Sequence, residues 1–375
     1  MRRRSVTNPA RIRRYALQAM AVGIGAGAAV LYFSRGDSIG RVLELSPSNL
    51  LTALALSAGV WIAIGARIWI LCRSLGCRIG AVRAFLIGAS AEFGVAASPG
   101  GVGGPALRVY LLHRTGVPMS VATTVLAADA LLDLLFFSAV APAALFTLLS
   151  DSHWRGAAGG ASVSVPALLA LVAAGSILAL AALRASLLLR RAEKWARRSP
   201  RCRTLGMAPR IRLIRNRIVR ARTRIHGGLK TLAGRRKGAV LLALVFTAAQ
   251  WLCRYGILPF LLAGLGHPVK ILPLIFIQGA IFACSLLLVA PGGGGGAELM
   301  ATLVLRRVVP VPVAGAAVVL WRIFTYHVNL VFGGALFGCA LRCDRGAPAA
   351  DIPPPGPHAG QVTADLTDRQ PVAGD

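Results

Sequence analysis

The feature that most constrains this chain is a series of apolar segments, each long enough to cross a lipid bilayer. A bilayer core of about 30 Å needs roughly 20 apolar residues in a helix. Only 15% of the 375 residues are charged, against about 25% in soluble proteins. We therefore predict an all-α polytopic membrane protein, rather than a soluble helical protein with an unusually large core. About six full crossings are expected, over residues 15–33, 50–71, 118–149, 163–189, 239–265 and 311–341.

Two glycine-rich stretches divide the chain into two similar halves. The first, PGGVGGP, covers residues 99–105, and the second, PGGGGGA, covers residues 291–297. When residues 99–122 are aligned without gaps to residues 291–314, 12 of the 24 positions are identical. Each stretch follows a short apolar segment and precedes another. This pattern is typical of membrane proteins with two structural repeats and broken helices at their centre.

The distribution of basic residues predicts the topology. Residues 1–14 contain six arginines and no acid, so we expect a basic cytoplasmic N-terminus before an uncleaved first helix, not a signal peptide. Residues 84–112 have basic residues on both sides and include the first glycine stretch, which favours a re-entrant hairpin. If residues 269–290 also begin a re-entrant hairpin, the halves form an inverted repeat; if they cross fully, the C-terminal tail lies outside.

The long loop between the halves is strongly basic. The chain has 42 Lys and Arg against 13 Asp and Glu, a formal charge of +29, and residues 190–237 contain 18 basic residues and one acid. Within this loop, apolar residues recur on one face of a predicted amphipathic helix. We expect this helix to lie on the anionic inner leaflet of the plasma (inner) membrane. Nucleic-acid binding is disfavoured because no aromatic or fold signal accompanies the charge.

The glycine stretches are the first candidate site. Consecutive glycines let backbone N–H groups converge on an anion, and a helix that starts there adds a partial positive charge. A lipid phosphate is the natural anion in a membrane. The alternative is that the glycines only allow close helix packing. The candidate residues are Pro99, Gly100, Gly101, Gly103, Gly104, Pro291, Gly292, Gly293 and Gly295.

Five charged residues within or beside apolar segments complete the candidate site: Arg108, Asp129, Asp133, Glu298 and Arg322. Charges are costly at membrane depth and usually have a partner. Asp129 and Asp133 share one helical face, so one should take up a proton or meet a cation. We hypothesise that an inverted repeat brings Arg322 to this acidic pair. Alternatively, Arg108 is a positive-inside anchor, and Glu298 caps the helix start.

The sequence lacks the motifs of several kinds of enzyme and metal-binding protein. No hydrolase elbow, nucleotide-binding loop or metal-binding spacing is present, so we expect no cofactor and no metal site. The seven cysteines are expected to be free thiols. His327 in the last apolar segment is interpreted as a packed or hydrogen-bonded histidine.

These features together resemble the lysylphosphatidylglycerol synthase transmembrane-region family, whose members are also called flippase-like domain proteins. The matching pieces are SPGGVGGPALR (98–108), DALLD (129–133), PGGGGGAE (291–298) and WRIFT (321–325). The chain departs from the family at Gly103-Gly104, where Gly-Glu is frequent, and at Asp129-Ala130, where Glu-Arg precedes the later Asp. The resemblance covers roughly residues 15–342 and implies a stand-alone protein that moves or binds lipids, without the soluble aminoacyl-transfer domain.

We therefore expect a flippase-like domain over residues 15–342 and a disordered tail over 343–375. The expected function is translocation or binding of a phospholipid, isoprenoid or glycolipid through a polar intramembrane groove. A membrane-embedded transferase acting on a lipid-linked substrate, and a non-transporting accessory subunit, remain as alternatives. The sequence does not indicate the oligomeric state.

Overall fold

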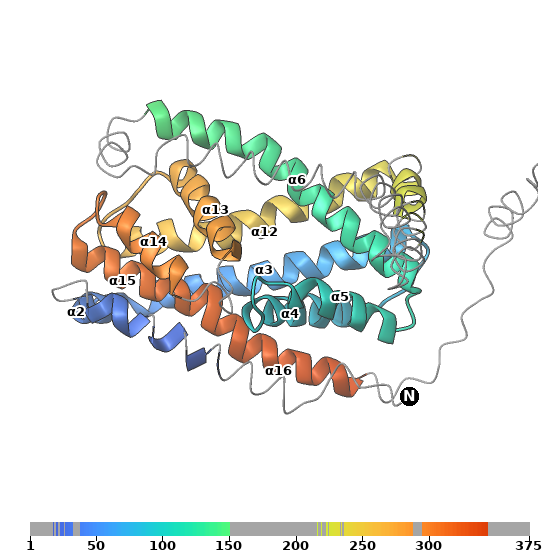
Figure 1. The fold of residues 1–375 in the computed structure, drawn as a ribbon, viewed down its shortest axis with the longest axis horizontal. Helices are drawn as coiled ribbons and strands as arrows, with labels where there is room; N and C mark the ends of the chain where they lie inside the picture. Colours follow the sequence, from blue (N-terminus) through green and yellow to red (C-terminus); the bar gives the residue numbers. More distant parts are fainter. Residues whose placement is uncertain are drawn as a thin grey trace, which may run out of the picture.

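The computed structural model describes residues 38–150, 236–287 and 295–343, with part of 18–32 and of 216–234 (Figure 1). Every regular element in these residues is a helix, as predicted. The termini, residues 151–215 and the predicted tail lie outside this part of the chain. Most of the predicted amphipathic helix also lies outside it.

The helices form two similar sets. The first set, preceded by the short α2 (Ser38–Leu43), is α3 (Pro47–Ser74), α4 (Ala81–Ala96), α5 (Gly103–Arg114) and α6 (Met119–Ser150). The second set is α12 (Lys237–Gly264), α13 (Ile271–Leu287), α14 (Gly296–Leu305) and α15 (Val311–Arg322), which continues through the π-helical turn η1 (Ile323–His327) into α16 (Val328–Cys343). Helix starts at 47, 81, 103 and 119 recur at 237, 271, 296 and 311, which are offsets of 190, 190, 193 and 192 residues. The repeat seen at the glycine stretches therefore extends over both halves.

Equivalent helices of the two sets run in opposite directions. α3 and α12 pack together with Gly59 beside Cys253 and Gly264 beside Asn49, so they are antiparallel. In Figure 1, α6 runs from right to left, whereas α15 and α16 run from left to right. The α4–α5 pair lies toward the right of the bundle and the α13–α14 pair toward the left. This is the arrangement that an inverted repeat produces.

Four helices in the described part of the chain are long and apolar enough to cross a membrane: Pro47–Ser74, Met119–Val140, Lys237–Gly264 and Val311–Cys343. They match four of the six predicted crossings. Of the other two, residues 163–189 are not described, and residues 15–33 are described only in part, with a short apolar helix at Gly23–Tyr32. The count of six therefore stays a prediction.

The first glycine stretch folds α5 back against α4. Gly100 and Gly101 adopt left-handed conformations, with φ of 59° and 70°, which side chains disfavour. Beyond this turn the backbones of Gly94 and Gly103 touch, because a Cβ built on Gly94 would lie 2.7 Å from the Gly103 carbonyl oxygen. At 1.5 Å per residue, the 16 residues of α4 span about 24 Å, less than the bilayer core. The hairpin therefore has the dimensions of a re-entrant element, although its entry from one side stays a prediction.

α4 lies in the interior of the bundle, with most of its residues buried. It packs against α3, α5 and α16, and Phe93 stacks on Phe337 with ring centroids 5.7 Å apart. Large apolar side chains face outward elsewhere, including Ile62, Leu134 and Leu241. Such a surface suits hydrocarbon rather than water. The end of the basic loop contributes Leu232, which packs into the same core as α4.

Candidate functional site

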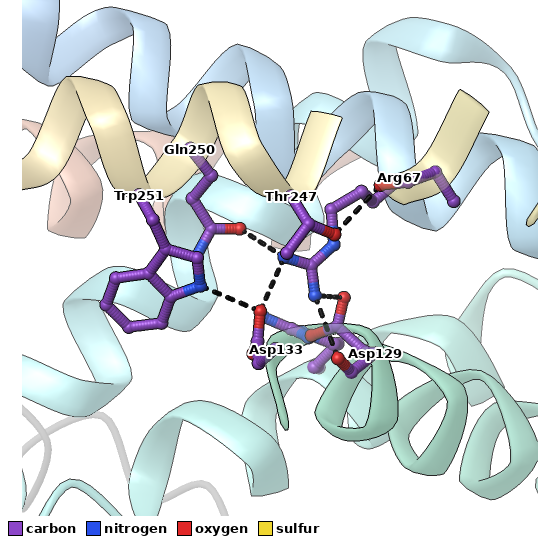
Figure 2. Close-up of polar contacts among 8 residues, drawn as sticks. Arg67, Asp129, Asp133, Thr247, Gln250 and Trp251 are labelled. Carbon is purple, nitrogen blue, oxygen red and sulfur yellow. Dashed lines mark hydrogen bonds and ion pairs between the residues drawn. The ribbon is translucent and has the colours of Figure 1, made fainter. Parts of the chain in front are cut away.

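An arginine at the centre of the bundle organises a network of polar side chains. Arg67 lies on α3 and is completely buried. Its Nη2 atom donates to the Asp129 carboxylate and, at 3.1 Å, to the Asp129 carbonyl oxygen. Its Nη1 atom donates to Asp133 Oδ1 at 2.9 Å and to Gln250 Oε1 at 2.7 Å (Figure 2). One guanidinium therefore connects α3 with α6 and α12.

A second arginine enters from the helix that follows the glycine turn. Arg108 on α5 pairs with the other carboxylate oxygen of Asp129. Trp251 Nε1 donates to Asp133 Oδ1 at 2.9 Å. We call Arg67, Arg108, Asp129, Asp133, Gln250 and Trp251 the Arg67 cluster. Its two cations and two anions balance, so the cation expected beside the acidic pair is supplied by Arg67 and Arg108.

The Arg67 cluster is buried at one end and more accessible at the other. The side chain of Arg67 is 0% exposed, that of Arg108 is 11% exposed and that of Asp133 is 28% exposed. The aromatic ring of Phe137 packs on Trp251 with centroids 4.7 Å apart, beside the accessible end. A ligand that approaches the cluster would therefore meet Asp133 and Arg108 before Arg67.

The glycine turn uses several of its N–H groups internally. The N–H of Gly103 donates to Ser98 Oγ at 2.8 Å, and the N–H of Gly101 donates to Ser98 O at 3.2 Å. A Cβ on Gly104 would lie 2.4 Å from a side-chain atom of Val95. The structure thus gives Gly103 and Gly104 a role in close packing, while anion binding at this turn stays a prediction. Pro291, Gly292 and Gly293 lie outside the described residues, and Gly295 takes a φ of 83° just before α14.

A second ion pair lies in the other half. Arg322 Nε on α15 donates to Glu298 Oε1 in the first turn of α14 at 2.7 Å. The hypothesis that Arg322 reaches Asp129 and Asp133 is wrong. The reason is that α15 packs on α14, which brings Arg322 to Glu298, whereas the acidic pair is neutralised from α3 and α5.

A π-helical turn follows Arg322 directly. The turn covers Ile323–His327, and Ser57 Oγ on α3 donates to the Phe324 carbonyl oxygen at 3.0 Å. His327 Nδ1 lies 3.2 Å from the Arg322 carbonyl oxygen, so His327 is hydrogen-bonded as predicted. Single π-helical turns inside helices occur frequently at functional sites.

The sequence reasoning missed four polar residues that lie on α3 and α12. They are Arg67, Gln250 and Trp251 of the Arg67 cluster, and Arg254, which pairs with Glu92 at 2.6 Å. A detectable signal was present, because Arg67 and Arg254 are single charges inside apolar segments. The five described cysteines are free thiols, as predicted. Among the described residues, no three side chains of His, Cys, Asp or Glu gather as a metal site would require.

Comparisons with known proteins agree with the architecture. A family model described as "Lysylphosphatidylglycerol synthase TM region" matches residues 19–333. Over 297 residues, the chain is 25% identical to a UPF0104 membrane protein of Archaeoglobus fulgidus, an alignment that covers 76% of this chain and 84% of that protein. The family match contains both ion-pair sites and both glycine stretches.

Proposed function

The chain belongs to the lysylphosphatidylglycerol synthase transmembrane-region family, and from this premise we propose that it binds a lipid headgroup inside the bilayer and moves the lipid between leaflets. The protein is a multi-pass membrane protein with a lipid-related family context. The proposal concerns the finer step, which is binding at the Arg67 cluster followed by translocation.

The observation that carries the proposal is the Arg67 cluster itself. Each charge placed at the centre of a membrane helix costs about 2.5–3.5 kcal/mol on insertion scales, so charged residues there are usually functional. This chain places Arg67, Asp129 and Asp133 within its candidate membrane helices and adds Arg108 from the glycine hairpin. A network built only for stability could use apolar side chains of similar volume at no cost.

The geometry suggests how a phosphate could enter. Asp129 has two cationic partners, Arg67 and Arg108. Arg108 can therefore leave Asp129 for a lipid phosphate while Asp129 stays neutralised by Arg67. Arginine binds phosphate well because its planar guanidinium offers parallel N–H donors. We propose that Asp133, at the accessible end, faces the remainder of the headgroup in a polar groove, and that the acyl chains stay in the surrounding lipid.

Replacing Arg108 by glutamine is expected to slow lipid movement about tenfold, which corresponds to about 1.4 kcal/mol of lost headgroup binding. The measurement uses the full chain in phosphatidylcholine vesicles with trace headgroup-varied phospholipids carrying a fluorescent acyl chain, and follows the loss of outer-leaflet label to a membrane-impermeant quencher. Arg108→Lys should retain part of the rate because it keeps the charge.

The matched control is Arg41→Gln, because Arg41 forms an exposed pair with Glu44 outside the site. Its rate should equal that of the natural sequence. The proposal fails if the natural sequence moves no labelled lipid in either direction under any gradient, or if Arg108→Gln moves lipid at the natural rate.

We also propose an orientation with the N-terminus in the cytoplasm of the plasma (inner) membrane and residues 190–237 on the anionic leaflet. The last turns of α3, α5 and α16 contain Arg73, Arg114 and Arg342. These helices end toward the same end of the bundle in Figure 1, which supports a shared cytoplasmic side. A fluorescent protein fused after residue 343 should then fold and fluoresce in the cytoplasm. A periplasmic phosphatase fused at the same place should be inactive; an active fusion would mean that α13 crosses fully.

A further inference from the structure

The Glu92–Arg254 ion pair joins the two halves of the bundle. Arg254 Nη2 on α12 pairs with Glu92 Oε2 on α4 at 2.6 Å, and the two side chains are 17% and 7% exposed. The Arg254 guanidinium also lies 5.3 Å from the ring centroid of Trp251. Trp251 Nε1 in turn donates to Asp133. The pair is therefore continuous with the Arg67 cluster, and Arg254 is partly accessible.

Two arginines of this network are incompletely hydrogen-bonded. Arg108 reaches Asp129 through Nη1, and Arg254 reaches Glu92 through Nη2. The Nε atom of each arginine is buried without an acceptor in the described part of the chain. Glu92 also lies within electrostatic range of Arg108, so one carboxylate is near both arginines. A buried donor without an acceptor costs free energy, so these arginines are suited to a ligand that supplies oxygen atoms.

The atoms that lack partners in this network are hydrogen-bond donors. Among the described residues of the Arg67 cluster and the Glu92–Arg254 pair, the buried polar atoms without a partner are the Nε atoms of Arg67, Arg108 and Arg254. Each is an N–H group, and no carboxylate oxygen of the network is among them. The network therefore lacks acceptors. The oxygens of a phosphate supply acceptors together with negative charge, whereas an amine supplies further donors.

We propose that Arg108 and Arg254 bind one terminal phosphate of the lipid from two sides, and that Glu92 holds Arg254 until the phosphate arrives. This inference rests on the proposed function and names its substrate class, a lipid that ends in a phosphate monoester. Each guanidinium can donate two parallel hydrogen bonds. A monoester offers three unesterified oxygens, so both guanidiniums can bind bidentately and share one oxygen. A phosphodiester offers only two.

The two arginines come from different halves of the inverted repeat. Arg108 follows the glycine turn on α5, and Arg254 lies within α12. Substrate sites of transporters with inverted repeats lie where the two repeats meet. A phosphate between α5 and α12 would connect the halves directly. Because Glu92 and the phosphate compete for Arg254, the carboxylate weakens phosphate binding while it keeps Arg254 paired in the empty site.

Calorimetric titration of the full chain in detergent micelles tests the site without requiring lipid movement. The probes are dihexanoyl phosphatidic acid, which ends in a phosphate monoester, dihexanoyl phosphatidylglycerol, which contains a diester, and inorganic phosphate. Phosphatidic acid should bind at least about tenfold more tightly than either other probe. Equal binding of the two lipids would overturn the proposed class. Equally tight binding of inorganic phosphate would assign the site to the free ion and overturn the lipid.

Substitutions of the two partners should act in opposite directions. Arg254→Gln should weaken the binding of phosphatidic acid about tenfold because it removes donors, whereas Glu92→Gln should tighten it because it removes the competitor. Arg254→Lys keeps the charge but loses the fork of parallel donors, so it should bind both lipids about equally. The control is Glu44→Gln, which changes an exposed pair with Arg41 and should leave every affinity unchanged.

A purely structural ion pair predicts other results. Arg254→Gln and Glu92→Gln would then both lower the free energy of unfolding and leave the affinity for phosphatidic acid unchanged, which would overturn the role of Arg254. If Glu92→Gln does not fold, Arg254→Lys still decides the point, because a retained preference for phosphatidic acid would overturn it. A chain that binds phosphatidic acid through Arg254 but moves no lipid would keep this site and lose the proposed function.

Discussion

Replacing Arg67 by methionine should lower the free energy of unfolding by about 3–5 kcal/mol, the range expected when one partner of a buried ion pair is removed. Methionine fills similar volume but leaves Asp133 without its cation, and leaves Asp129 with Arg108 as its described cationic partner. Denaturant titration of the purified chain in detergent micelles measures the change. Arg41→Met, in an exposed pair with Glu44, should cost only about 0–1 kcal/mol.

A double variant distinguishes the loss of the Arg67–Asp133 attraction from the cost of leaving the Asp133 carboxylate without its cation. Arg67→Met combined with Asp133→Asn should be more stable than Arg67→Met alone, because the second change removes a half-buried carboxylate that has lost its described cationic partner. If the Arg67→Met variant has the same free energy of unfolding as the natural sequence, water reaches the Arg67 cluster and solvates the carboxylates. In that case the buried network would not be the structural centre described here.

Replacing Gly94 by alanine should destabilise the chain by at least about 1–3 kcal/mol, the usual cost of overpacking a tight contact. The added Cβ would lie 2.7 Å from the carbonyl oxygen and 2.8 Å from the carbonyl carbon of Gly103. Backbone atoms cannot rotate away as side chains can, so α4 and α5 must separate. Because α5 carries Arg108, lipid movement should fall together with stability.

Gly256→Ala is the matched control for this change. Gly256 lies inside α12, and a Cβ there would meet no atom within 4 Å. Alanine is the better helix former by up to about 1 kcal/mol, so this variant should be unchanged or more stable. If Gly94→Ala unfolds at the same denaturant concentration as Gly256→Ala, the close approach of α4 and α5 is not needed for folding.

The predictions for Arg67 and Gly94 concern connected parts of one network of contacts. The glycine contacts hold α5 against α4, and α5 brings Arg108 to the carboxylate that Arg67 already binds. Arg67 can be kept in an apolar helix because it has four acceptors on α6 and α12. The same surplus of cations around Asp129 is what would allow Arg108 to exchange partners with a lipid phosphate.

Part of the site could be predicted from residue type alone. Asp129 and Asp133 are four residues apart in an apolar segment, which predicts a shared face and a nearby cation. Arg67 could have been identified by the same rule, as a single charge inside residues 50–71. The partner of each charge could not be predicted, because Arg67 and Asp133 are 66 residues apart and no local pattern joins them. The repeat even suggested the wrong partner for Arg322.

The sequence by itself determined the class of the protein, its repeat and the places where its helices break. Those properties follow from apolar segment length and from glycine and proline, which act over a few residues along the chain. Only the tertiary structure decided which charges pair and which donors stay without an acceptor. Such pairing depends on contacts between helices that are distant in the chain, namely α3 with α6 and α12, and α14 with α15. Neighbouring positions on a helix point about 100° apart around its axis, so a contact shifted by one residue would bring a different side chain to the partner helix. The pattern of apolar residues along the chain does not specify contacts at that precision.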